Sequence, residues 1–178
     1  MIQKILDNYT DIKTKHLTIG EGGVFTKPTA VHTVLGSCVA VTFFCRKTQI
    51  GAIFHALLPK WSDHEKDEFG INHYKYVDSA INTLCNRFRQ KGLTEGDIEC
   101  KIFGGANAMV EENIGMGKKN VETAFETLTE QKMKITATDV GGKVGRKIVF
   151  ITNTGEVYAK RLGGQVFSEQ TPLKTASP

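Results

Sequence analysis

Two consecutive apolar segments constrain the fold of this chain more than any other feature of its sequence. They are VAVTFF at residues 39–44 and IGAIFHALL at residues 50–58, and the charged corner CRKTQ joins them. Their β-branched and aromatic residues favour strands, and the short polar connection favours a hairpin. Because both segments are apolar on both faces, they belong in the middle of a sheet that is covered on each side.

The other apolar patterns alternate between helical and extended periods. Helical spacing predicts one helix over roughly residues 74–91, ended by Gly92, and a second around residues 121–128. Further strands are predicted at DIECKIF, MKITATDV, GRKIVFIT and GEVYAKRL, the last two forming a hairpin across residues 153–155. Residues 1–16 fit a helical turn or two, and LTIGEGGVFTKP fits a short strand that enters a glycine turn. This order predicts an α+β fold in which helices cover a mixed sheet.

Length and composition predict one globular domain over residues 1–178. We place its core at about residues 18–165 and expect a loose tail at residues 167–178. No apolar run approaches the roughly 20 residues of a membrane span, and the N-terminal stretch lacks the features of a secretion signal, so we expect a cytoplasmic protein that is not embedded in a membrane. The net charge of +4 comes from scattered lysines, which argues against a nucleic-acid partner.

The sequence offers no convincing metal site or disulfide framework. Its four cysteines form no CxxC pair and have no histidines at zinc-site spacing: Cys38, Cys45, Cys85 and Cys100. The last three have no base nearby in the sequence, and we interpret them as packing residues. His64 and His73 flank acidic residues, but their irregular spacing favours a solvated loop over a metal site. The sequence therefore argues against structural zinc and against a disulfide framework.

Cys38 differs from the other cysteines because it follows Gly36 and Ser37 in a tight turn before the first apolar segment. Peptide N–H groups of such a turn can point into a cleft and form an oxyanion hole. His55 lies in the next apolar segment, and a hairpin would return it toward the level of Cys38. There it could take the proton of the Cys38 thiol. A thiol with the ordinary pKa of about 8.5 is mostly protonated at pH 7 and needs such a base. The alternative is an ordinary hydrogen-bonded core histidine, and these residues alone leave both interpretations open.

Several ordered blocks of the sequence resemble the CheD family of chemoreceptor glutamine deamidases. VLGSCVAVTFF and GAIFHALLP are similar to the family's LGSCV motif and to its downstream histidine motif. IGEGGVFTKP resembles its first strand, and three later blocks follow in the family's order: KIFGGANAM, IGMGKKNVE and DVGGKVGRKIVFITNTGEVYAKRL. The resemblance covers most of residues 18–162.

The resemblance implies a cysteine hydrolase that deamidates selected glutamine side chains of methyl-accepting chemotaxis receptors to glutamate and releases ammonia. Some members of the family also hydrolyse glutamyl methyl esters. Cys38 would be the nucleophile and His55 the base. The resemblance implies that neither a metal nor an organic cofactor is needed. The implied fold is a layered α/β/β/α arrangement with mixed sheets, similar to the catalytic domain of the cytotoxic necrotizing factor toxins. The implied partners are the helical cytoplasmic region of the receptors, which we expect to contact the loop at residues 60–73, and a CheC-type phosphatase.

Two other functions remain open. One is a regulatory binding module that acts mainly by stimulating a CheC-type phosphatase, and the other is a papain-type peptidase. The presence of both Cys38 and His55 favours the deamidase over the binding module, and a cysteine that precedes two strands instead of opening a helix argues against the peptidase. The Gly-Gly pairs beginning at residues 104, 141 and 163 lack the context of a phosphate-binding loop, so we interpret them as turns, with Gly104 and Gly105 as candidates to line the cleft.

The third catalytic group has two candidates. The family uses a threonine a few residues before the cysteine to hold the histidine, and this sequence offers Thr33 next to His32. Successive side chains of a strand point to opposite faces, so only one of the two can face the cleft. We assign the role to Thr33, whose hydroxyl can accept the imidazole N–H and fix the tautomer. His32 is the alternative orienting group or a second base.

Overall fold

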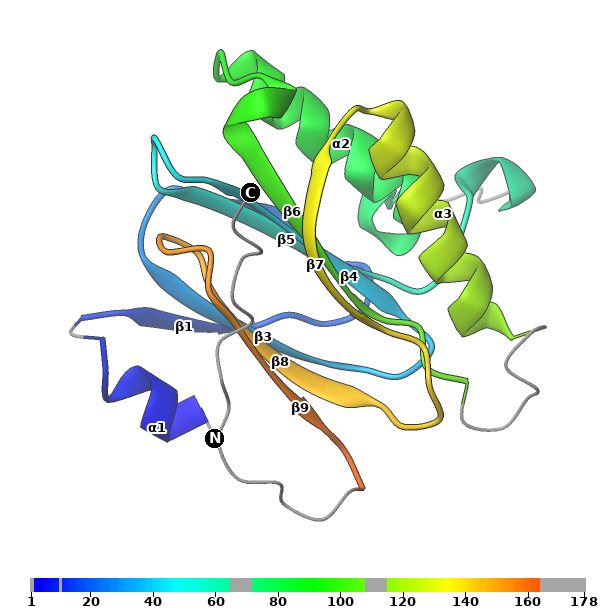
Figure 1. Ribbon diagram of the computed structural model, residues 1–178, viewed down its shortest axis with the longest axis horizontal. Helices are drawn as coiled ribbons and strands as arrows, with labels where there is room; N and C mark the ends of the chain where they lie inside the picture. The colour runs from blue at the N-terminus through cyan, green and yellow to red at the C-terminus, as the bar shows by residue number, and fades with distance from the viewer. Residues whose placement is uncertain (1, 10, 65–71, 108–114, 164–178) are drawn as a thin grey trace.

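The computed structural model describes residues 2–9, 11–64, 72–107 and 115–163 (Figure 1). Its strands are β1 (Lys13–His16), β2 (Gly22–Phe25), β3 (Thr29–Leu35), β4 (Val39–Cys45), β5 (Ile50–Ala56), β6 (Ile98–Gly104), β7 (Lys134–Val140), β8 (Arg146–Ile151) and β9 (Val157–Arg161). Its α-helices are α1 (Ile2–Leu6), α2 (Val77–Gln90) and α3 (Met116–Glu130). The strands form a four-stranded sheet in the order β1–β3–β8–β9 and a five-stranded sheet in the order β2–β5–β4–β6–β7. Each sheet is mixed, because the β1–β3 and β6–β7 pairs are parallel and the other pairs are antiparallel.

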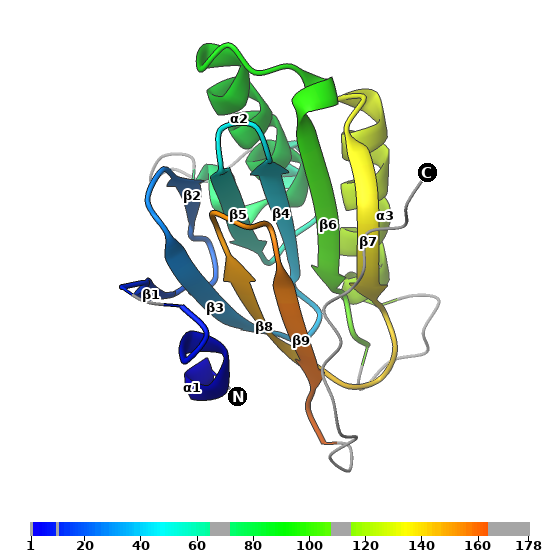
Figure 2. The same ribbon diagram turned by 60° about the vertical axis from the view of Figure 1, so that its left-hand side comes forward.

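The two sheets pack face to face, and the long helices cover the outer face of the five-stranded sheet (Figures 1 and 2). Apolar side chains from both sheets fill the space between them: Leu17, Val31, Leu35, Cys38, Ala40, Ile53, Phe103, Ile148, Phe150 and Val157. α2 buries the apolar face predicted from its sequence, which consists of Val77, Ala80, Ile81, Leu84, Cys85 and Phe88. On the far side, Ile5 of α1 packs with Ala30, Val149 and Ile151 of the four-stranded sheet. The layers are therefore helices, sheet, sheet and one short helix.

The hairpin predicted from the two apolar segments is confirmed by β4 and β5. They pair antiparallel with Ala40 opposite His55, and β6 pairs with the other edge of β4. All seven residues of β4 are buried. The cause is the one inferred from the sequence, because helices cover one face of this strand and the second sheet covers the other.

The structure corrects the sequence prediction at two places. Residues 30–59 predicted two strands, but they contain three, because β3 belongs to the other sheet and the short turn at residues 36–38 carries the chain across to β4. The glycine turn near Gly20 was predicted to follow a strand that includes Leu17, whereas β1 ends at His16 and a further strand, β2, follows the turn. Residues 65–71 of the predicted contact loop and the predicted tail lie outside the described residues.

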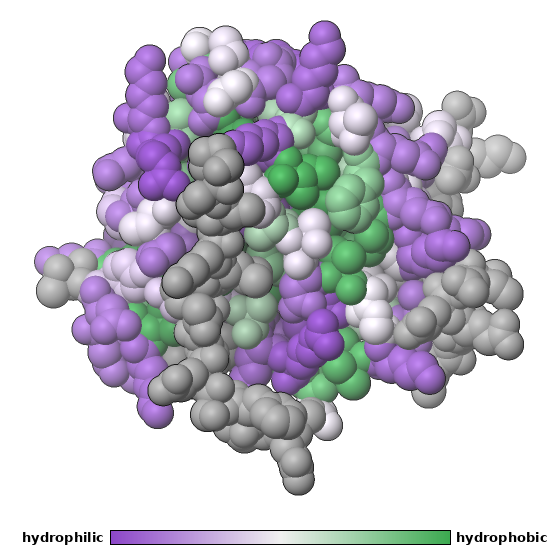
Figure 3. Space-filling view, viewed as in Figure 1, coloured by the Kyte–Doolittle hydropathy of each residue, from purple (hydrophilic) through white to green (hydrophobic). Residues whose placement is uncertain are grey.

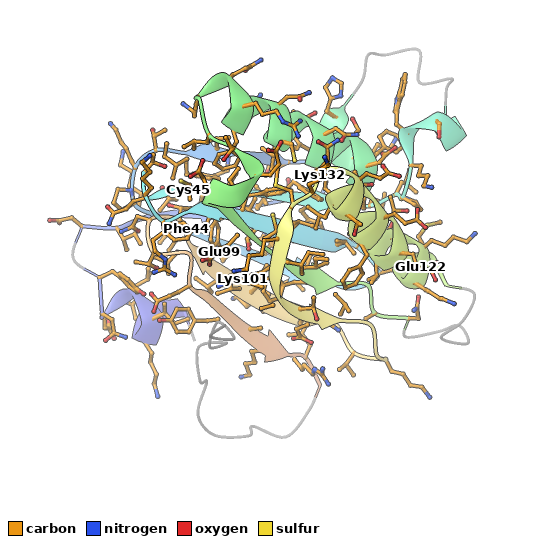
Figure 4. The ribbon with its side chains drawn as sticks, turned by 45° about the horizontal axis from the view of Figure 1, so that its top comes forward. Phe44, Cys45, Glu99, Lys101, Glu122 and Lys132 are labelled. Atoms are coloured by element: carbon orange, nitrogen blue, oxygen red, sulfur yellow. The ribbon has the colours of Figure 1, made fainter. Side chains whose placement is uncertain are left out.

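A buried lysine connects the two sheets at the end of the sandwich where the β8–β9 turn lies. Lys101 of β6 donates a hydrogen bond from Nζ to the carbonyl oxygen of Gly155 over 2.7 Å, and burial lowers its pKa. Figure 4 shows Lys101 and Glu99 on β6 beside Phe44 of the neighbouring β4, in agreement with the strand register. The contact fixes the β8–β9 hairpin against the five-stranded sheet.

Candidate active site

Cys38 lies where the chain passes from one sheet to the other, directly before β4. Its side chain is only 7% exposed and belongs to the core between the sheets. Burial raises the pKa of the thiol, and the backbone N–H of Cys38 itself lowers it by a smaller amount. The resting side chain is therefore a neutral thiol, and a thiolate requires a base.

His55 and Thr33 meet across the two sheets. Thr33 of β3 is buried, and its Oγ1 lies 2.9 Å from Nδ1 of His55 on β5. The same hydroxyl donates its single proton to the carbonyl oxygen of Leu17 over 2.7 Å. Toward His55 it can therefore only accept, which places the imidazole proton on Nδ1. Nε2 is then the basic nitrogen, and burial lowers the pKa of His55, so the ring is neutral near pH 7.

Cys38 and His55 lie on the same face of the five-stranded sheet without a hydrogen bond between them. Ala40 is opposite His55 in the ladder, and Cys38 precedes it by two residues, which makes Cys38 and His55 diagonal neighbours. Diagonal pairs are roughly 7–8 Å apart, within reach of a long or aromatic side chain. Within the described residues, Nε2 of His55 is buried and has no hydrogen-bond partner. The structure therefore places a buried imidazole nitrogen without a hydrogen-bond partner on the same face of the sheet as the thiol.

His32 lies on the opposite face of β3 from Thr33 and therefore points away from His55. It pairs with His16 of β1, with the two Nδ1 atoms 3.2 Å apart and the ring centroids 4.9 Å apart. Its position on the outer face follows from the alternation of side chains along β3, whose Val31, Thr33 and Leu35 are buried. Of the two sequence candidates for the orienting group, the structure brings only Thr33 into contact with His55.

The carbonyl groups of the Cys38 turn all accept hydrogen bonds from neighbouring elements. Ala106 N–H donates to the carbonyl oxygen of Gly36 over 2.8 Å, and Gly105 N–H donates to that of Cys38 over 2.8 Å. The carbonyl oxygen of Ser37 accepts a hydrogen bond from Nδ2 of Asn120 on α3 over 2.9 Å. The segment after β6 and helix α3 thus hold the turn from behind, and Gly105 is one of the residues that do so.

Asn120 and Arg146 are site residues that sequence reasoning missed. Nδ2 of Asn120 also donates to the carbonyl oxygen of Leu57 over 3.0 Å, so one amide joins the Cys38 turn to the end of the strand that carries His55. The guanidinium of Arg146, 1% exposed, donates to the carbonyl oxygen of Gly104 over 3.0 Å and to those of Asp139 and Gly141. The signal for Asn120 is an asparagine on the buried face of a helix, where a polar group needs a specific partner.

Gly104 is a glycine for a definite steric reason. Its φ of +110° is in the region that side chains other than glycine rarely adopt, and a Cβ there would lie 2.1 Å from the carbonyl oxygen of Cys38. The backbone of β6 can therefore approach the Cys38 turn only without a side chain. This explains the first residue of the Gly-Gly pair predicted as a turn.

A groove of about 440 Å³ adjoins the back of the turn between α3 and the ends of β6 and β7. It is lined by Gly105, Asn107, Lys118, Val121, Glu122, Phe125, Val140, Gly141 and Gly142. Figure 3 shows apolar side chains on this part of the surface, interrupted by polar ones.

The other three cysteines, Cys45, Cys85 and Cys100, are buried packing residues, as predicted, and burial raises the pKa of Cys85 to about 11. Among the described residues, no group of three or more His, Cys, Asp or Glu side chains could hold a metal ion.

Comparison with known proteins identifies related sequences over most of the chain. The model of a family described as CheD chemotactic sensory transduction matches residues 57–161. A protein of Maridesulfovibrio salexigens named probable chemoreceptor glutamine deamidase CheD is 38% identical over 167 residues, which cover 90% of this chain and 98% of the relative. Relatives of similar name from Geobacter sulfurreducens and Oleidesulfovibrio alaskensis are 42% and 43% identical, each over 83% of this chain and over 89% and 72% of their own lengths.

A solved structure, that of the hypothetical protein YfiH from Bacillus licheniformis, superimposes with a TM-score of 0.46 at 12% identity and covers 69% of this chain and 51% of its own. None of the helices in the described residues is long and apolar enough to cross a membrane. The family model matches more than half of the chain, and the three relatives match 83% or more of it. The chain therefore belongs to the CheD family.

Proposed function

We propose that this protein deamidates glutamine side chains of chemotaxis receptors to glutamate and releases ammonia, with Cys38 as nucleophile, His55 as base and Thr33 as the group that orients His55. The names of the relatives supply the reaction and the class of substrate. The observation that supports the residue roles is the hydrogen bond from Nδ1 of His55 to Thr33, which leaves Nε2 without a partner on the sheet face that also carries Cys38.

The reaction proceeds in two halves that balance in atoms. The sulfur of Cys38 attacks the side-chain carbonyl carbon of glutamine while His55 takes the thiol proton, and the carbonyl oxygen becomes an oxyanion. The imidazolium then protonates the departing amide nitrogen, so that ammonia leaves and a thioester remains. In the second half His55 takes a proton from water, the hydroxide attacks the thioester, and glutamate and the free thiol are released. A glutamyl methyl ester would follow the same course with methanol as the leaving group.

Both reacting groups start out neutral. Burial raises the pKa of the Cys38 thiol and lowers the pKa of His55, so neither group favours its charged form before the substrate binds. The proton therefore moves from sulfur to imidazole as the attack takes place. The thiol therefore becomes a nucleophile only as its proton passes to His55.

The test is to incubate the protein with a cytoplasmic receptor fragment and to follow ammonia release and a mass gain of about one unit per modified site. We expect Cys38→Ala to abolish both, because no other cysteine combines a nearby base with a turn of this kind. Cys85→Ala, which alters a buried cysteine on α2, is the matched control and retains activity. Iodoacetamide should label Cys38 faster than Cys85. A folded Cys38→Ala variant that still releases ammonia contradicts the proposal.

The family resemblance carries further expectations that go with this proposal. They are a cytoplasmic location, contact with the helical region of the receptors, a CheC-type phosphatase as a second partner, and kinship in fold with the cytotoxic necrotizing factor toxins. Co-purification with a CheC-type phosphatase, compared between the unmutated protein and Cys38→Ala, separates a binding role from the catalytic one. The catalytic variant should still bind.

A further inference from the structure

We propose that Asn120 is a positioning residue that holds the Ser37–Cys38 peptide plane, so that the N–H of Cys38 serves as an oxyanion donor. The inference rests on the cysteine chemistry of the proposed function and adds a residue to it. It assigns to helix α3, which carries none of the reacting groups, control over the part of the site that stabilises charge.

The side-chain amide of Asn120 makes two hydrogen bonds to the backbone. The side chain is fully buried, and Nδ2 donates both of its protons to carbonyl oxygens, those of Ser37 at 2.9 Å and Leu57 at 3.0 Å. Only the nitrogen end of the amide can donate to carbonyls, so these partners fix the orientation of the side chain. Within the described residues, Oδ1 of Asn120 is buried without a hydrogen-bond partner. A buried amide that leaves its own oxygen unpaired is costly, which indicates a specific demand for its two donors.

Because of the geometry of the peptide bond, the hydrogen bond from Asn120 to the Ser37 carbonyl also sets the direction of the Cys38 N–H. The described residues contain no cis peptide bond, and in a trans peptide the carbonyl of one residue and the N–H of the next point in opposite directions. Asn120 draws the carbonyl of Ser37 toward α3. The N–H of Cys38 must therefore point away from the helix, toward the face of the sheet where the thiol lies.

The pKa of the thiol agrees with this direction of the N–H. The backbone N–H of Cys38 lowers the pKa of its own thiol, by less than burial raises it. When the sulfur attacks a carbonyl carbon, the new oxyanion forms next to the sulfur and hence next to this N–H. The Gly36 carbonyl is held in the same way by Ala106, which orients the N–H of Ser37 as the neighbouring peptide group. Removing a single oxyanion donor typically lowers turnover by about 10²–10³-fold.

Two reagents separate this role from a general structural one, and neither needs a receptor. Acylation of Cys38 by p-nitrophenyl acetate passes through a tetrahedral oxyanion, whereas alkylation by iodoacetamide needs only the thiolate. Asn120→Leu, of similar size but without donors, and Asn120→Ala are compared with Thr123→Val, which alters another buried polar residue of α3. Both rates are measured at Cys38 by peptide mass spectrometry across pH, and thermal unfolding identifies the conditions in which every variant is folded.

We expect the acylation rate of both Asn120 variants to fall by about 10²-fold, the alkylation rate and its pH dependence to change by less than about threefold, and Thr123→Val to leave both rates unchanged. An equal loss of both rates, no loss of either, or no acylation of Cys38 in the unmutated protein overturns the inference. If the expected difference appears but receptor fragments release no ammonia, the proposed substrate is wrong and the role of Asn120 stands.

Discussion

Replacing Thr33 by valine tests the central contact of the site with almost no change in shape. The hydroxyl accepts from Nδ1 of His55 and donates to the carbonyl of Leu17, and the residue is 1% exposed. The substitution leaves both partners buried and unpaired, and each unpaired group costs about 1–3 kcal/mol. Because a valine methyl group fills the space, no cavity adds to this cost, and we expect the free energy of unfolding to fall by about 2–6 kcal/mol.

The effect on catalysis has a different origin and can be measured separately. Without the hydroxyl, nothing in the contact selects the tautomer with the proton on Nδ1, so Nε2 is less often free to take the thiol proton. Loss of a partner that orients a functional histidine typically costs 10–100-fold, or about 1.4–2.7 kcal/mol in the barrier. Ammonia release from a receptor fragment gives the rate well below the unfolding temperature, and imidazole ¹⁵N shifts of His55 give the tautomer.

Two variants provide the controls. Thr33→Ser keeps the hydroxyl and should retain most of the activity and the Nδ1–H tautomer, and His32→Ala should change little because His32 faces His16 on the outer surface. If Thr33→Ser lost as much activity as Thr33→Val, the hydroxyl would not be the relevant group. A larger loss in His32→Ala than in Thr33→Val would move the orienting role to His32.

Two further predictions concern the pH dependence of His55 and the backbone next to Cys38. Burial lowers the pKa of His55, so the acid limb of kcat/KM should lie below the ordinary histidine value of about 6.5. As the pH falls, His55 of the unfolded chain takes up its proton before His55 of the folded chain does. The contribution of His55 to stability is therefore complete above about pH 6.5 and is lost as the pH falls toward the lowered pKa. An acid limb above pH 6.5, or a pH dependence of stability unchanged in His55→Gln, would contradict this. Gly104→Ala should lower the free energy of unfolding by about 2 kcal/mol or more and reduce deamidation at least tenfold, because the new Cβ meets the carbonyl oxygen of Cys38 at a positive φ. Urea unfolding and ammonia release check it against Gly23→Ala, where a Cβ meets nothing within 4 Å, and equal behaviour of the two variants would refute it.

The parts of the fold that were predictable from the sequence are those governed by local burial. β4, β5 and α2 carry their apolar residues at periods that report directly which faces are covered. The assignment of β3 to a second sheet depends on its pairing with β8, more than 100 residues away, and no local pattern contains that information. Short polar turns can lead to a hairpin partner or to another sheet with the same residues.

The candidate site was predictable to the same extent. The family resemblance left Thr33 and His32 as candidates for the orienting group, and strand alternation allows only one of them to face the site. Only the position of Leu17 and His55 shows which face is the inner one. Asn120 was not found because its partners are backbone carbonyls, and a carbonyl has no signature in the sequence. The donors and acceptors of the main chain become visible only when the tertiary structure brings them together.

The position of Cys38 on the link between the two sheets bears on whether incompletely folded copies of the protein can react. Thr33 belongs to one sheet and His55 to the other, so a chain in which either sheet has formed alone carries the thiol but lacks a positioned base. Nascent or damaged copies would then be inert toward the many glutamines that surround them. Chemical competence would require the docking of the two layers and would be lost when they separate.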